Sequence, residues 1–75
     1  TSLNLVEKLL LLSLLYVGQL KGCFVVKEKK HKTTIIGEVS ELSPQTLSIR
    51  TNEGYRLVEI VDVLEIRLWE EEVYD

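Results

Sequence analysis

The stretch TTIIGEVSELSPQTLSIRT (residues 33–51) decides the fold. In its first half apolar and polar residues alternate, so that Ile35 and Val39 lie on one face of an extended chain. Pro44 then interrupts the pattern, because proline presets a turn angle and has no N–H to donate to a sheet. Alternation resumes from Leu47 onward. The stretch therefore predicts two strands joined by a turn.

The same period of two continues on both sides of this stretch. It predicts a short strand over residues 23–26 before it, and strands over 55–61 and 63–69 after the turn at 52–54. Five short strands in a chain this size favour a small, strongly bent barrel. The predicted fold is mainly β, with an N-terminal helix followed by a five-stranded, strongly bent open barrel.

Residues 1–21 are expected to form that helix. Nine of the fourteen leucines lie in this segment, which has no proline and few β-branched residues. Asn4 and Glu7 are spaced as a capping pair at the helix start. Gly18 or Gly22 is expected to end the helix.

The predicted helix is apolar on opposite faces. One stripe at helical spacing contains Leu5, Leu9, Leu12, Tyr16 and Leu20. The other face carries Leu10, Leu14 and Val17, and a small domain covers only one side of a helix. We therefore expect these three residues to be contacts between copies of the chain in a homo-oligomer.

Two other uses of the apolar segment fit the sequence less well. A transmembrane span is not expected, because the uninterrupted apolar run covers only about half of the ~20 residues required. Residues 20–23 resemble the lipobox of bacterial lipoproteins, which would make the segment a secretory signal, but Lys21 and Glu7 do not fit that reading. A single cysteine, Cys23, fits a reducing compartment, and we expect a cytoplasmic protein.

Length and charge limit the remaining function classes. A chain of 75 residues with 45% hydrophobic and 28% charged residues makes one folded domain over residues 1–75. The net charge is −3, but residues 1–32 carry +4 and residues 33–75 carry −7. This split argues against a broad nucleic-acid surface and suggests that the basic segment of one copy lies near the acidic part of the next.

Catalysis and cofactor binding are not expected. The chain has one histidine and one cysteine, too few for a structural zinc site, and neither has a partner that would make it a nucleophile or base. The acidic tail 70–75 is expected to be solvated, with a weak divalent-ion site as the alternative. Trp69, with Tyr74 nearby, is either an exposed binding anchor or packed on the helix.

The segment from Gly37 to Ile49 resembles the first motif of the Sm-like family, which includes Sm, Lsm and bacterial Hfq proteins. Residues 63–66, Val-Leu-Glu-Ile, resemble the end of its second motif. The resemblance implies a helix followed by a five-stranded barrel, bent at Gly37, that assembles into a ring and binds RNA. Residues 61–66 resemble the ending of bacterial YolD-like proteins about equally well, which makes that family the second choice.

The family's RNA pocket is not matched by residue type. Its positions fall on Ser43, Gln45 and Thr46, where the family has an acidic residue and an RNA-stacking or Asn position. Residues 60–62 read Ile-Val-Asp, where Sm proteins have Arg-Gly and Hfq has Tyr-Lys-His. The resemblance thus implies the scaffold more strongly than the pocket.

A basic segment remains as the candidate nucleic-acid contact. It consists of Lys27, Lys29, Lys30, His31 and Lys32. These side chains would contact phosphates without reading bases, or else form a solvated hairpin whose charges prevent aggregation. The sequence predicts either a small RNA-binding oligomer or a structural or protein-interaction oligomer on the same scaffold.

Overall fold

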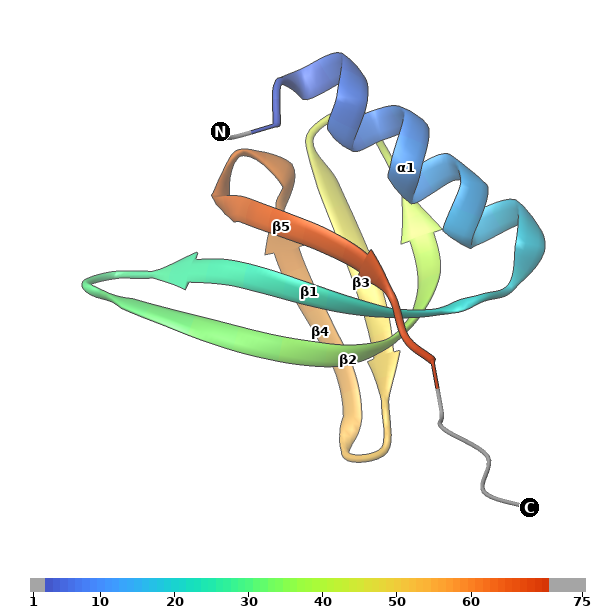
Figure 1. The fold of residues 1–75 in the computed structure, drawn as a ribbon. Helices are drawn as coiled ribbons and strands as arrows, with labels where there is room; N and C mark the ends of the chain where they lie inside the picture. Colours follow the sequence, from blue (N-terminus) through green and yellow to red (C-terminus); the bar gives the residue numbers. More distant parts are fainter. Residues whose placement is uncertain (1–2, 71–75) are drawn as a thin grey trace.

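The computed structural model describes residues 3–70 and contains one helix followed by five antiparallel strands (Figure 1). The elements are α1 (Leu5–Gly18), β1 (Lys21–Glu28), β2 (His31–Leu42), β3 (Thr46–Thr51), β4 (Gly54–Glu59), the 3₁₀ turn η1 (Ile60–Asp62) and β5 (Val63–Leu68). The strands form one sheet in the order β4-β3-β2-β1-β5. The predicted mainly β fold with an N-terminal helix is confirmed, and the sheet is bent but not closed.

The helix begins where the capping pair predicts. The Asn4 side chain accepts the N–H of Glu7 at 2.8 Å, and Glu7 Oε1 accepts the N–H of Asn4 at 3.1 Å. The helix ends at Gly18, followed by Gln19 with a left-handed φ of 51°. It is therefore shorter than the predicted 1–21, because the chain turns at Gln19 to enter β1. No helix within residues 3–70 is long and apolar enough to cross a membrane.

The strand boundaries differ most from the predicted ones at β1 and at the end of β4. β1 runs from Lys21 to Glu28, well beyond 23–26, because the charged residues that follow Val26 remain paired with β2. β4 ends at Glu59 instead of continuing to residue 61. The next three residues form η1, which carries the chain from one outer strand of the sheet to the other, with Ile60 fully buried.

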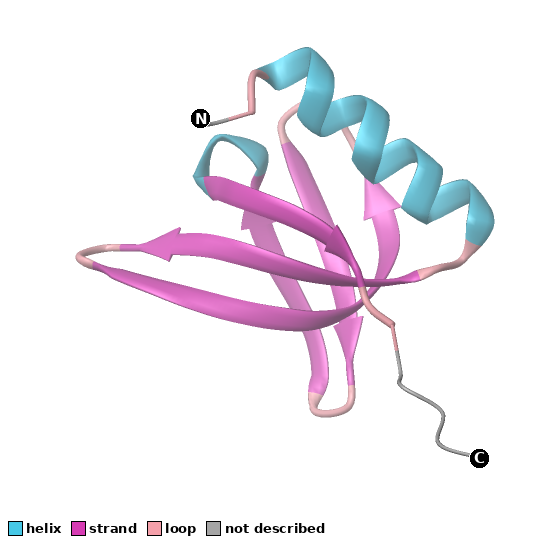
Figure 2. Cartoon of the chain, viewed as in Figure 1, coloured by secondary structure: helices cyan, strands magenta, loops and turns pink. Residues whose placement is uncertain are grey.

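The sheet bends within β2. This strand pairs with β1 up to Glu38 and with β3 from Glu38 onward, and its register with β3 shifts between Val39 and Glu41. A Cβ atom added to Gly37 would lie 2.1 Å from the carbonyl oxygen of Arg50. Glycine is therefore required at position 37 by the close approach of the β3 backbone. Figure 2 shows β1 and β2 crossing β3 and β4 as a result.

The core lies between α1 and the bent sheet. Its buried apolar residues are Leu12, Leu15, Phe24, Val26, Ile35, Val39, Leu47, Ile49, Val58, Ile60 and Val63.

The buried face of α1 differs from the predicted stripe. Leu12 and Leu15 are buried, Leu9 packs beside them, and Leu5, Tyr16 and Leu20 are exposed. The helix is therefore rotated toward Leu15, and it touches the narrow sheet along only part of its circumference.

The bend at Gly37 gives a first prediction. Gly37→Ala should lower the free energy of unfolding by about 3 kcal/mol, because a methyl group cannot fit against the backbone of Arg50 without moving a strand. Urea unfolding followed by circular dichroism measures the change.

Gly18→Ala is the matched control. Its added Cβ would meet only the flexible side chain of Leu20 at 3.1 Å, so its effect should stay within about 0.5 kcal/mol. Equal losses in the two variants would contradict the role assigned to Gly37.

Candidate interaction surfaces

The two outer strands of the sheet each have a free edge that carries exposed apolar side chains. On β4, Tyr55 is 68% exposed and Leu57 is 76% exposed. Leu68 is also exposed at the end of β5. The Trp69 N–H donates to Lys21 O at 2.9 Å, which extends the pairing of β5 with β1. Trp69 is 39% exposed and lies outside the buried core cluster, and Tyr74 lies outside the described residues.

An apolar groove lies between α1 and β5. It has a volume of about 180 Å³ and is lined by Leu11, Leu14, Leu15, Leu20, Ile66, Arg67 and Leu68. Arg67 forms its only charged wall, and the Arg67 Nε donates to Glu65 Oε1 at 2.9 Å. That hydrogen bond, together with the carboxylate charge, raises the pKa of Arg67 above its ordinary value. Arg67 therefore remains a cation, and Glu65 of the same strand balances its charge.

A second, more polar groove was not predicted. It has a volume of about 330 Å³ and lies between the first half of β2 and the β3–β4 turn, lined by Thr34, Ile35, Ile36, Thr51, Asn52, Glu53, Gly54, Tyr55 and Arg56. It opens because β2 and β3 pair only from Glu38 and Arg50 onward. Arg56 on its wall forms an ion pair with Glu28 of β1. No sequence motif marks it, since its residues come from three strands.

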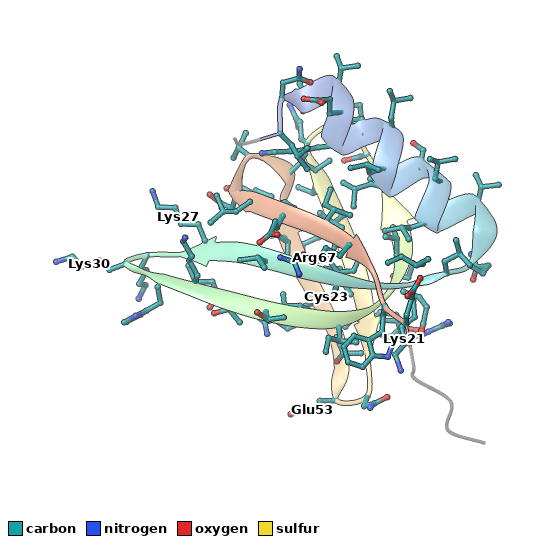
Figure 3. The ribbon with its side chains drawn as sticks, viewed as in Figure 1. Lys21, Cys23, Lys27, Lys30, Glu53 and Arg67 are labelled. Atoms are coloured by element: carbon teal, nitrogen blue, oxygen red, sulfur yellow. The ribbon has the colours of Figure 1, made fainter. Side chains whose placement is uncertain are left out.

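The five candidate nucleic-acid contacts lie together at the β1–β2 turn, and all are exposed: Lys27, Lys29, Lys30, His31 and Lys32. Figure 3 shows Lys27 and Lys30 at the end of the hairpin that projects from the molecule. In the register of the hairpin Lys27 lies directly opposite Lys32. Two like charges in directly opposed positions destabilise an antiparallel pair. The hairpin therefore carries an electrostatic cost that an anionic partner would relieve.

The positions of the family's pocket lie at the other end of β2 from the basic hairpin. Ser43 Oγ accepts the N–H groups of Gln45 and Thr46 at 3.3 and 3.0 Å, so its oxygen is used within its own turn. The N–H of Ile60 donates to Gln45 O at 2.9 Å, which places η1 beside this turn. The two segments of the expected pocket are adjacent, but neither 43–46 nor 60–62 contains a basic or aromatic side chain.

Metal-ligating side chains are dispersed over the part of the chain that the structure describes. Within residues 3–70 no three His, Cys, Asp or Glu side chains come together as a group that could hold a metal ion. Cys23 is a half-buried free thiol. The carboxylates at 71, 72 and 75, named above as an alternative ion site, lie outside the described residues.

No protein-family model, curated protein or solved structure matches this chain. The resemblances to Sm-like and YolD-like proteins therefore stay predictions, and the conclusions below depend on the geometry of the surfaces.

The opposed lysines give a second prediction. Lys32→Glu should raise the free energy of unfolding by about 0.5 kcal/mol at low salt, because it places opposite charges across the hairpin. Thermal or urea unfolding at low and high salt measures the gain, which salt should reduce.

Lys21→Glu is the control for the change of charge. Lys21 lies opposite Glu38, so this substitution creates a like-charge pair and should destabilise the chain. Destabilisation by Lys32→Glu would contradict the repulsion.

Proposed function

We propose that this chain is the subunit of a homo-oligomer in which the free edge of β4 in one copy pairs with the free edge of β5 in the next. The observation that carries the proposal is the open sheet, whose two outer strands both expose apolar residues. A free edge presents unpaired N–H and C=O groups, and a strand from a second copy satisfies them. The role is structural, not catalytic.

The side chains support this pairing. Leu57 is the most exposed apolar residue of β4 and lies opposite Ser48, on the outer face of the sheet. Burying one leucine stabilises a contact by roughly 1.5–3 kcal/mol. We propose that edge pairing sets Leu57 of one copy against the outer-face side chains of β5 in the next, Glu65 and Arg67, whose aliphatic parts it covers.

The contact is head to tail, since the two edges are different surfaces. Repetition of such a contact gives a ring when the rotation between copies closes, and a filament when it does not. A closed ring agrees with the resemblance of residues 37–49 to the Sm-like family, and we propose membership of that family with YolD-like proteins as the alternative. The unpaired Cys23 supports a cytoplasmic location.

Binding of RNA is the second candidate function. The observation that favours it is the exposed hairpin in which Lys27 faces Lys32, with Lys29 and Lys30 at the turn. Contacts from these side chains would be to phosphates and therefore insensitive to base identity. The turns at 43–46 and 60–62 supply no stacking or basic group, so this function ranks below assembly.

Edge pairing predicts a loss of mass in a β4 variant. Leu57→Glu should convert the assembly to smaller species at micromolar concentration, because it removes a leucine buried at the contact and adds a carboxylate beside Glu65 of the next copy. Its fold should be unchanged, since Leu57 is 76% exposed. Light scattering and native mass spectrometry measure the mass.

Val61→Glu is the matched control, because Val61 is 72% exposed and lies in η1 instead of on a sheet edge. It should retain the wild-type mass. A monomeric wild-type chain at micromolar concentration would contradict the proposal.

The RNA candidate predicts salt-dependent binding. Oligo(A) and oligo(U) should bind with similar affinity at 50 mM salt and at least tenfold more weakly at 200 mM, because binding releases counterions from phosphates. Fluorescence anisotropy measures both affinities. The double variant Lys29→Ala/Lys30→Ala should reduce the salt dependence, with Lys21→Ala as the control. Absence of binding at 50 mM salt would exclude this function.

A further inference from the structure

The outer face of α1 carries an apolar stripe that nothing in residues 3–70 covers. It consists of Val6, Leu10, Leu14 and Val17, which are 65%, 61%, 66% and 82% exposed. At 100° per residue these four side chains lie within one quadrant of the helix, opposite Leu12 and Leu15. Figure 1 shows α1 lying alone across the sheet, with its outer side free. We call this surface the helix stripe.

The helix stripe has the same order of residue types in both directions. Read forward or backward it is Val-Leu-Leu-Val, with spacings of four, four and three residues forward and three, four and four backward. In an antiparallel pair of helices, Val6 of each copy would lie against Val17 of the other. Leu10 of each copy would lie against Leu14 of the other. The only polar residue enclosed by the stripe is Ser13, which is small and near its centre. A two-fold rotation therefore sets valine against valine and leucine against leucine.

We propose that the helix stripe binds the helix stripe of a second copy, forming an antiparallel two-fold helix pair. This contact is separate from edge pairing, but its effect on the final assembly rests on the edge-paired oligomer proposed above. Edge pairing is head to tail, whereas helix pairing is symmetric. A closed assembly that contains both has dihedral symmetry and an even number of subunits.

Electrostatics favours the antiparallel direction. An antiparallel pair sets the positive end of one helix dipole beside the negative end of the other. A parallel pair would align equal ends and bring together the Glu7 side chains that border the stripe. The helix stripe itself contains no charged residue, so only the antiparallel arrangement avoids like charges at the contact.

A second copy fits this surface better than a lipid membrane does. Helices that lie in a membrane interface carry several Lys or Arg residues beside the apolar face. The only lysine within α1 is Lys8, whose Nζ is directed to the carbonyl oxygens of Ile60 and Val61 at 3.2 and 3.4 Å. The cationic hairpin residues lie on the sheet away from the helix (Figure 3). Arg67, in the groove that Leu14 also lines, is already paired with Glu65, so residues 3–70 provide no run of free basic groups beside the helix stripe for contact with phospholipid.

The length of the helix determines how strong one pair is. A 14-residue helix is about 21 Å long, so one pair is smaller than a standard stable interface. Several pairs formed at once between two edge-paired oligomers strengthen one another, because each pair raises the local concentration of the next. We therefore expect helix pairing to join two complete edge-paired oligomers.

The first test separates the two contacts by mass. The double variant Val6→Glu/Leu10→Glu leaves both outer strands, β4 and β5, unchanged and should halve the mass measured by native mass spectrometry. Val61→Glu is again the matched control and should keep the full mass. Circular dichroism should show the same fold for all three proteins.

Each outcome decides one proposal. If the wild-type chain is an oligomer and the double variant has the same mass, helix pairing is overturned and edge pairing is unaffected. Halving of the mass supports helix pairing. A halved mass in Val61→Glu as well would overturn the assignment to the helix stripe.

The second test fixes direction and partner. In a Cys23→Ser background, Val6→Cys and Val17→Cys chains are mixed and oxidised. The antiparallel pair predicts disulfides between the two variants, because two Val6 positions would lie about 16 Å apart along the axis and beyond disulfide reach. Disulfides only within the Val6→Cys chains would overturn the antiparallel pair. The wild-type chain is also tested for binding to anionic phospholipid vesicles. If it binds, and if Val6→Glu/Leu10→Glu abolishes binding without changing the oligomer mass, the stripe is a membrane contact and the proposal is overturned.

Discussion

The close approach of Gly37 to the carbonyl oxygen of Arg50 is the contact on which the rest of the structure depends. It lets one long strand, β2, belong to two halves of the sheet that point in different directions. Five strands can then surround a core that a flat sheet of this size would leave exposed. The same bend leaves β4 and β5 as the two outer strands, with free edges on opposite sides of the sheet. One glycine thus determines both the core and the surfaces offered to other copies.

Most of the fold follows from local patterns in the sequence, and the differences arise where tertiary contacts override them. Alternation over 33–51 predicts β2 and β3 closely, and Asn4 with Glu7 locates the start of the helix. The charged residues after Val26 carry no strand pattern, yet they are paired, because β2 continues alongside them. The inner face of α1 is predicted only in part: Leu12 is buried as expected, but the contact with the sheet rotates the helix so that Leu15 is buried and Tyr16 is exposed.

The candidate surfaces are also predictable only in part: exposure along one helix follows from the sequence, but grooves between separate elements do not. Exposure of Leu10, Leu14 and Val17 agrees with the expectation that a small domain cannot cover both helix faces. The groove beside β5 and the groove beside the β3–β4 turn combine residues from separate elements, so no spacing in the sequence marks them. The opposition of Lys27 and Lys32 also needs the hairpin register, because it depends on which two residues occupy the turn.

The two proposed contacts are coupled because an edge-paired oligomer presents several helix stripes at once. The first helix pair between two such oligomers raises the local concentration of the remaining stripes, so later pairs form with a smaller loss of translational freedom. Coupling between two binding sites is reciprocal, so helix pairing strengthens edge pairing by the same factor. Assembly is therefore expected to be cooperative, with the complete particle and the single chain populated more than the intermediates between them. Cooperative assembly covers both parts of the exposed apolar surface, the sheet edges and the helix stripe, together.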